Sequence, residues 1–333
     1  MGVNRRHFLT NSLAVAAGTL GPGMEGAVKS PHGNSFRLYP YGSVQFQDTR
    51  IKAPLTFAHV TDLHLTPDPK EATNKPYRHG IEWWDATFNR PHQVLPTLLA
   101  EIRAAGVDFV FFGGDNIDCY DPQIAERLAG LVQDYGLKAY FQSGNHDWES
   151  LPIRYVTHQY DASLRSENLR KLCRHWGMPA SYYSFELKGI RFVVLDPPYM
   201  KVGGSWSGFF DDEQTEWFLK QLQHDGPIVV FHHIPFHPPT LEYRLRTVWG
   251  GQLACVADDA NGQRVLHAIE TSPNILGTLT GHAHIRSEDP LGQTCQFMTA
   301  PLSDAQWRYV KISDAPPPKS LRAEGTPDIR AAT

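Results

Sequence analysis

Five stretches of this chain share one pattern, in which a run of apolar or β-branched residues ends on aspartate, asparagine or histidine. Runs of this kind, bounded by glycine or by polar residues, are typical of buried strands. In open α/β sheets, ligands bind outside the carboxyl ends of the strands, so we expect the five polar ends to meet in one crevice. The stretches are 57–64, 109–116, 140–147, 228–235 and 275–284.

Apolar residues at helical spacing lie between these strands. They predict helices over 92–105, 123–135, 162–176 and 211–223. Alternating residues over 181–187 and 191–196, with Lys188-Gly189 between them, predict a hairpin, so the sheet that contains it is mixed. Two more strands are predicted near 294–298 and 307–312, closing a second sheet.

In several segments the apolar residues follow neither helical nor strand periodicity. The chain up to Pro54 is predicted to be irregular, and 66–91 is either a long loop over the site or a surface insertion. Segment 197–210 is a loop that could wall a substrate pocket or simply pack. Segment 237–261 carries Arg244 and Arg246, which could bind phosphate, although a solvated surface is the favoured interpretation.

Composition narrows the class of partner. With 333 residues and 41% apolar content, the chain can form one large domain or two ordinary ones. A formal net charge of -4 argues against a nucleic-acid partner held by charge and favours a small substrate. Beyond the N-terminus, no apolar segment reaches the roughly 18 residues that a membrane span needs, so we expect no span in the mature protein.

The N-terminus has the order of an export signal. Arg5-Arg6 precedes an apolar stretch over 13–20, which resembles a twin-arginine signal, with a frayed amphipathic segment as the alternative. The resemblance implies a signal over residues 1–30, the twin-arginine export machinery as a partner, and a periplasmic or extracellular location. The four cysteines are far apart, so they could pair or stay free, and the proline-rich tail over 314–333 is predicted to be mobile.

The polar strand ends contain residue types that bind metals. Asp62 and His64 are two residues apart, and residues two apart in a strand face the same way, so they could offer one metal an oxygen and a nitrogen. Asp115 follows a glycine that permits a tight turn. Asn145 could ligate through its amide oxygen.

Histidines supply the rest of the candidate chemistry. His146 could donate a proton, and Asp147 could orient or charge it. The last of the five strands ends with two histidines, His282 and His284, which are two residues apart. His232 and His233 are adjacent, and neighbouring strand residues face opposite ways, so only one is expected to be a ligand; we favour His233.

In this order, the motifs closely resemble those of the calcineurin-like metallophosphoesterase superfamily. They are Asp62-x-His64, Gly114-Asp115, Gly144-Asn145-His146-Asp147, His233-x-Pro235 and Gly281-His282-x-His284. The resemblance spans about residues 55–312, and we place the domain at 50–313. It implies an α/β fold, a four-layer αββα sandwich of two mixed β-sheets flanked by helices, with a two-metal site.

The resemblance also implies a role for each residue. Asp62, His64 and His284 would hold one metal ion; Asn145, His233 and His282 would hold the other; Asp115 would bridge the two. Oxygen and imidazole ligands suit Mn, Fe, Zn or Co. The two ions would generate a bridging hydroxide for in-line attack on phosphorus. His146, paired with Asp147, would stabilise the transition state or protonate the leaving oxygen.

One position bears on the substrate. Purple acid phosphatases place a metal-binding tyrosine three residues after the bridging aspartate, where this chain has Asp118, so we expect no purple ferric site. The motifs look more like those of class III cyclic-nucleotide and glycerophosphodiester phosphodiesterases, which implies hydrolysis of a small phosphodiester. A phosphomonoesterase with the same metals and a non-catalytic binding protein are the alternatives, and the complete ligand set argues against the latter.

Overall fold

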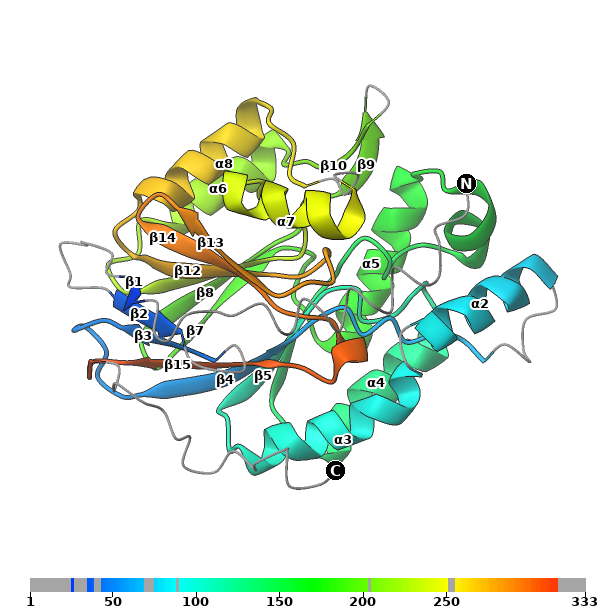
Figure 1. The fold of residues 1–333 in the computed structure, drawn as a ribbon, viewed down its shortest axis with the longest axis horizontal. Coiled ribbons are helices and arrows are strands. Elements are labelled where there is room, and N and C mark those ends of the chain that lie inside the picture. The colour runs from blue at the N-terminus through cyan, green and yellow to red at the C-terminus, as the bar shows by residue number, and fades with distance from the viewer. Residues whose placement is uncertain are drawn as a thin grey trace.

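Two β-sheets packed face to face form the centre of the molecule, with helices on both outer faces (Figure 1). The computed structural model describes residues 25–26, 35–38, 43–68, 75–87, 90–202, 205–250 and 255–316. This arrangement confirms the predicted four-layer αββα sandwich of two mixed sheets.

The first sheet has seven strands, and its three central parallel strands lead to the site. In spatial order the strands are β1 (Glu25–Gly26), β2 (Ser35–Leu38), β3 (Val44–Gln47), β15 (Arg308–Ser313), β4 (Leu55–Val60), β5 (Phe109–Gly113) and β6 (Ala139–Gln142). β4, β5 and β6 are parallel, whereas β15 runs antiparallel to β4. The carboxyl ends of β4, β5 and β6 therefore share one edge of the sheet.

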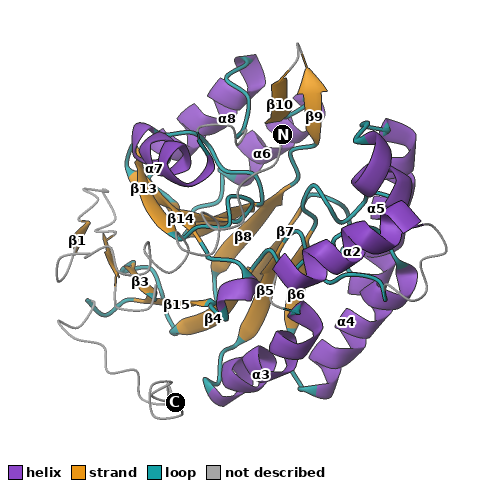
Figure 2. Cartoon of the chain, turned by 45° about the vertical axis from the view of Figure 1, so that its right-hand side comes forward, coloured by secondary structure: helices purple, strands orange, loops and turns teal. Residues whose placement is uncertain are grey.

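The second sheet has six strands. In spatial order they are β13 (Ser287–Leu291), β14 (Thr294–Met298), β12 (Ile275–Thr280), β11 (Ile228–His232), β8 (Ile190–Leu195) and β7 (Tyr183–Leu187). β11 is parallel to both β8 and β12. A separate hairpin consists of β9 (Tyr199–Val202) and β10 (Ser205–Gly208) (Figure 2).

Aspartates begin most of the covering helices. Helix α3 (Pro91–Ala104) and α4 (Pro122–Asp134) cover the first sheet, and α5 (Ala162–Trp176) packs on α4. Helices α6 (Asp212–Gln221), α7 (Pro239–Trp249) and α8 (Ala260–Thr271) lie over the second sheet. The side chains of Asp121, Asp161, Asp211 and Asp259 accept backbone N–H groups at the starts of α4, α5, α6 and α8, as N-caps do.

Phenylalanine rings fill the space between the two sheets. Phe231 of β11 stacks on Phe111 of β5, with ring centroids 3.5 Å apart, and meets Phe57 of β4 edge-on at 5.8 Å. All three side chains are fully buried. Burial of apolar rings this large is the main favourable contribution to packing, so these contacts fix the two sheets relative to each other.

Some predicted elements were wrong in detail. The chain before Pro54 is not irregular throughout, because β2 and β3 add to the first sheet, which therefore begins before the predicted domain boundary at residue 50. Segment 66–91 contains α2 (Lys75–Thr87), 197–210 contains the β9–β10 hairpin, and 237–261 contains α7. Strand β15 joins the first sheet, not the second.

The predicted export signal and C-terminal tail fall almost entirely outside the described residues. The four cysteines are free thiols, so the open question of pairing is answered against disulfides in this structure. Among the described helices, none has both the length and the apolar character needed to cross a membrane.

An arginine on the first sheet is buried against the second sheet. Arg308 of β15 donates from Nη2 to the Oε1 of Glu288 on β13 at 3.0 Å and to the carbonyl of Met298 on β14 at 2.6 Å. The two side chains are 2% and 7% exposed. A buried charge that loses its partner is left uncompensated, so this pair is sensitive to single substitutions.

Arg308→Ala should lower the free energy of unfolding by up to about 3–5 kcal/mol, because Glu288 would stay buried with only its longer contact to Arg286 Nε, at 3.3 Å. The double variant Arg308→Met, Glu288→Leu should lose less, since it removes both charges. Arg264→Ala, which breaks an exposed pair with Glu216, is the matched control and should cost about 0–1 kcal/mol. Urea unfolding measures all three, and equal midpoints for Arg308→Ala and Arg264→Ala would contradict this interpretation.

Candidate metal centre

The candidate ligands come from the loops that follow five strands, β4, β5, β6, β11 and β12. All five carboxyl ends lie at the same side of the sandwich, so residues more than 200 positions apart in the chain become neighbours. The polar strand ends therefore meet, as expected from the sequence, and their acidic and histidine side chains form three overlapping groups among the described residues. Two of these groups contain the predicted ligands, and the third consists of His64, Asp118 and His146.

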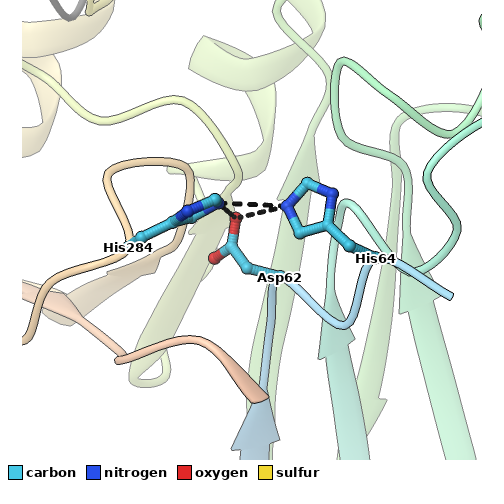
Figure 3. A group of neighbouring side chains, drawn as sticks. All are labelled: Asp62, His64 and His284. Carbon is cyan, nitrogen blue, oxygen red and sulfur yellow. Dashed lines mark hydrogen bonds and ion pairs between the residues drawn. The ribbon is translucent and has the colours of Figure 1, made fainter. Parts of the chain in front are cut away.

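The first group contains Asp62, His64 and His284, which point toward one another (Figure 3). The Nε2 atoms of His64 and His284 are 3.0 Å apart, and Asp62 Oδ1 lies 3.3 Å from His284 Nε2. The donor atoms of the group all lie within 4.8 Å of one another. Two imidazole nitrogens and a carboxylate oxygen at these separations suit a transition-metal ion.

The second group contains Asp115, His233 and His282. His233 Nε2 lies 3.1 Å from Asp115 Oδ2, and Asn145 Oδ1 lies 2.9 Å from His282 Nδ1. The amide oxygen of Asn145 therefore borders this group. Its donor set again combines oxygen with imidazole nitrogen, so the residues fit a second ion.

Asp115 faces both groups. Its Oδ2 atom lies 3.1 Å from His233 Nε2 and 3.8 Å from His64 Nε2. Its other oxygen accepts the backbone N–H of His146 at 2.8 Å, which fixes the orientation of the carboxylate. Asp115 therefore lies between the two groups.

Left-handed backbone, not strand pleating, aims these side chains. Asp62 and His64 lie beyond the end of β4, with φ of 53° and 47°, so the expectation that strand alternation places them on one face was wrong. The same positive φ occurs at three other candidate ligands, Asp115, His282 and His284. Such conformations are costly for residues with a Cβ and are concentrated at functional sites.

Two glycines make room for the carboxylates. A Cβ on Gly144 would overlap Asp115 Oδ1, and one on Gly281 would lie 2.5 Å from Asp62 Oδ2. Both glycines immediately precede residues of the centre. Any larger residue at either position would displace a candidate ligand.

The buried carboxylates and imidazoles of the centre shift one another's pKa values. Burial favours the neutral carboxyl, but His284 and His233 outweigh it and lower the pKa of Asp62 to about 2. Burial likewise opposes the charged imidazole of His233, but Asp115 and Asp62 raise its pKa to about 9. Burial and the charge on His233 lower the pKa of His282 to about 3. A charged imidazole at His233 thus offsets part of the negative charge of the buried carboxylates.

The expected pairing of His146 with Asp147 was wrong. Asp147 accepts the backbone N–H groups of Ile117 at 2.9 Å and Gly144 at 2.6 Å, so both its oxygens hold loops. The carboxylate beside the His146 ring is Asp118, whose Oδ1 lies 3.4 Å from Nδ1. Asp147 is therefore a structural residue that shapes the turn before His146.

Asp118 is the functional residue that sequence reasoning missed. Its carboxylate lies 3.3 Å from His64 Nδ1, accepts from Arg154 Nη2 at 2.9 Å, and accepts the Tyr155 hydroxyl at 2.5 Å. Burial opposes its ionisation, but Arg154 and His146 hold the pKa of Asp118 well below its usual range. A carboxylate on the far nitrogen of a ligand histidine fixes the ring and its tautomer.

Trp84 of α2 covers this side of the centre. Its ring lies nearly parallel to His64 at 5.5 Å and meets His146 at 5.9 Å, and the Arg154 guanidinium lies 4.2 Å from its ring centroid. Arg154 belongs to a short π-helix over Ile153–Thr157 that packs on α2. Trp84 and the neighbouring Trp83 lie in segment 66–91, where no periodicity predicted a helix.

The structure separates the two adjacent histidines. His233 belongs to the second group, whereas His232 packs against Phe236 at 5.0 Å and its Nδ1 hydrogen-bonds the Ile234 carbonyl at 2.8 Å. Burial lowers the pKa of His232 to about 4, as expected for a neutral ring in the interior. Of the two arginines singled out in 237–261, Arg246 pairs with Glu242 on the surface of α7, and Arg244 Nη1 donates to the carbonyl of Arg286 at 3.5 Å.

Comparison with known proteins identifies the family of this chain. Residues 55–286 match the family described as calcineurin-like phosphoesterase. A probable cyclic nucleotide phosphodiesterase from Synechococcus sp. is 25% identical over 237 residues, covering 69% of this chain and 73% of that protein. A glycerophosphodiester phosphodiesterase from Enterobacter lignolyticus is 28% identical over 184 residues, covering 53% and 56%. A dimetal phosphatase from Danio rerio shares 16% identity over 74% of this chain and 88% of its own, with a TM-score of 0.47.

His233→Ala should lose one bound metal, because it removes a donor atom of the second group. His232→Ala is the matched control: it should keep both metals and reduce activity by no more than about 10- to 100-fold, the size of an effect transmitted through a neighbouring ligand. Metal content of the two purified variants, measured side by side, decides the assignment. Loss of a metal from His232→Ala and not from His233→Ala would contradict it.

Proposed function

Because this chain belongs to the calcineurin-like phosphoesterase family, we propose that it is a binuclear metal-dependent phosphodiesterase acting on a small phosphodiester. The observation that carries the proposal is the pair of adjoining donor groups with Asp115 facing both. The ligands are Asp62, His64, Asp115, Asn145, His233, His282 and His284.

The donor set supports transition metals. Each group combines carboxylate oxygen with imidazole nitrogen, which suits Mn, Fe, Zn or Co better than Mg or Ca. When bound, the ions would supply the Lewis acidity that polarises a phosphoryl oxygen and acidifies a water molecule. Asp118 in place of a tyrosine argues against a purple ferric site.

His146 is the proposed acid that protonates the leaving oxygen. Burial and Arg154 oppose its protonation, but Asp115 and Asp118 outweigh them and raise the pKa of His146. Its Nδ1 faces Asp118, and its Nε2 lies 3.7 Å from Asp115 Oδ2, on the side of the metal ligands. The proton on Nε2 is therefore the one available to a substrate, while Asp118 holds the opposite side of the ring.

Two relatives support a diester substrate. Proteins at 25% and 28% identity carry the names of a cyclic nucleotide and a glycerophosphodiester phosphodiesterase. A phosphomonoesterase with the same metals is the alternative, since the metal ligands do not distinguish the two reactions. The complete set of donor residues argues against a binding protein without catalysis, because a degenerate member of the family would be expected to lack some of them.

The export route is a second proposal. Arg5-Arg6 and the apolar stretch that follows support a twin-arginine signal over residues 1–30, which would deliver the folded protein to the periplasm or the exterior. Export in a folded state suits an enzyme that acquires its metals before translocation.

The protein should hydrolyse bis-p-nitrophenyl phosphate with a higher kcat/KM than p-nitrophenyl phosphate, and chelation should abolish both activities.

His146→Ala should lower kcat by about 10²- to 10⁴-fold, the usual contribution of a general acid. Release of nitrophenolate measures each rate, and the metal content of the same samples serves as the control. Full activity in metal-stripped protein would refute the mechanism, and a higher kcat/KM for the monoester would favour the alternative.

Residues 1–30 fused to a reporter should direct export that depends on the arginine pair. The variant Arg5→Lys, Arg6→Lys should retain the reporter inside the cell, because the twin-arginine pathway reads that pair. Cell fractionation gives the measurement, and the unmodified fusion is the control. Unchanged export of the variant would rule out this route.

A further inference from the structure

The two oxygens of the Asp118 carboxylate have different partners. Asp118 is fully buried. Three donor atoms surround Oδ1: His64 Nδ1 lies at 3.3 Å, and Arg154 donates from Nε at 3.1 Å and from Nη2 at 2.9 Å. Among the described residues, Oδ2 has a single donor, the hydroxyl of Tyr155 at 2.5 Å. The orientation of the carboxylate therefore depends on Tyr155 as well as on Arg154.

The Tyr155 hydroxyl stops the carboxylate from turning. The last torsion of an aspartate side chain has a broad range, so hydrogen bonds to both oxygens are needed to fix it. Removal of the hydroxyl would leave Oδ2 of Asp118 buried without a donor, and a buried acceptor that loses its partner raises the free energy of the folded state. Rotation that relieves Oδ2 would move Oδ1 away from His64 Nδ1.

Helix α2 holds the Tyr155 ring from the other side. Gly80 of α2 lies so close to the ring that an added Cβ would be 2.5 Å from Tyr155 Cδ1. Alanine is favoured over glycine in a helix interior, so the close contact with the ring is what this glycine permits. Tyr155 itself belongs to the π-helix Ile153–Thr157, a rare conformation that is frequent at functional sites.

We propose that Tyr155 is a positioning residue for the first donor group: its hydroxyl fixes Asp118, and Asp118 fixes the ring of His64. Gly80 gives the Tyr155 ring its place. Among the described residues, the Asp118 side chain makes no hydrogen bond or ion pair to a member of the second donor group, so the effect should be confined to the first group. The inference rests on the metal centre of the proposed function.

Metal affinity tests the proposal without catalysis. Metal-stripped protein is titrated with Zn²⁺ in competition with a chelating dye, which resolves two dissociation constants in the wild type. Tyr155→Phe removes the hydroxyl and keeps the ring, so it should raise one constant by about 10- to 100-fold and leave the other unchanged. In the His64→Ala background, Tyr155→Phe should have no further effect on the metal that remains, because the histidine on which it acts is absent.

Gly80→Ala tests the same chain of contacts from α2. It should weaken binding of the same metal, because the added methyl group displaces the Tyr155 ring. Helix propensity alone predicts only a more stable helix. Gly130→Ala on α4 is the matched control, since a Cβ there meets nothing within 4 Å, and it should leave both dissociation constants at their wild-type values.

Tyr183→Phe separates positioning from a general loss of stability. The Tyr183 hydroxyl is also buried and donates to the Phe141 carbonyl at 2.7 Å. Its removal should lower the temperature of unfolding while both metal affinities are kept. Thermal unfolding of every variant shows whether it folds, and Gly80→Ala decides the question if Tyr155→Phe does not fold.

The outcomes distinguish this proposal from the general one. If the wild type binds two metals and Tyr155→Phe changes neither constant, or raises both equally, the positioning role is overturned and the proposed function stands. A further loss of affinity caused by Tyr155→Phe in the His64→Ala background would also overturn it. A wild type that binds no metal would refute the proposed function and this inference together.

Discussion

Two carboxylates buried inside one cluster of histidines are the constraint on which this structure depends. Asp62 and Asp115 are almost fully buried, and removing an ion from water costs several kcal/mol even after relaxation. The surrounding imidazoles compensate that cost only where one of them is charged, which is why the pKa of His233 rises to about 9 while that of Asp62 falls to about 2. A metal ion bound between these side chains would therefore compete with the proton on His233, and its binding would release protons.

The same constraint ties the two sheets together. The first donor group takes Asp62 from the first sheet and His284 from the second, and the second group takes Asp115 from the first sheet and His233 from the second. Neither sheet alone supplies all the members of either of these two groups. The phenylalanine packing between the sheets and the buried Arg308 contact thus position the chemistry as well as stabilise the fold.

Sequence patterns predicted the strands and candidate ligands because both depend on local features: apolar runs, a following glycine, and a metal-binding residue type. They failed where geometry depends on distant partners. β15 was placed in the wrong sheet because its neighbours, β3 and β4, lie far away in the chain. Asp118 was missed because its role comes from His64 and Arg154, which no spacing connects to it. Asp147 looked catalytic by adjacency, yet it holds backbone amides.

Two arginines lie at the borders of the centre, and each is paired with a carboxylate. Arg154 is bound to Asp118 on one side, and Arg165 is bound to Asp196 on the other, so neither arginine brings net positive charge to a substrate. Under the proposed function, attraction for a phosphoryl group would then come from the metal ions, because the carboxylates of the centre are themselves negative. Trp84 and Asp118 border both His64 and His146, so a proposed ligand and the proposed acid share the same supports. A centre built this way would gain its affinity for phosphate from its metals, while the flanking arginines hold the carboxylates beside it.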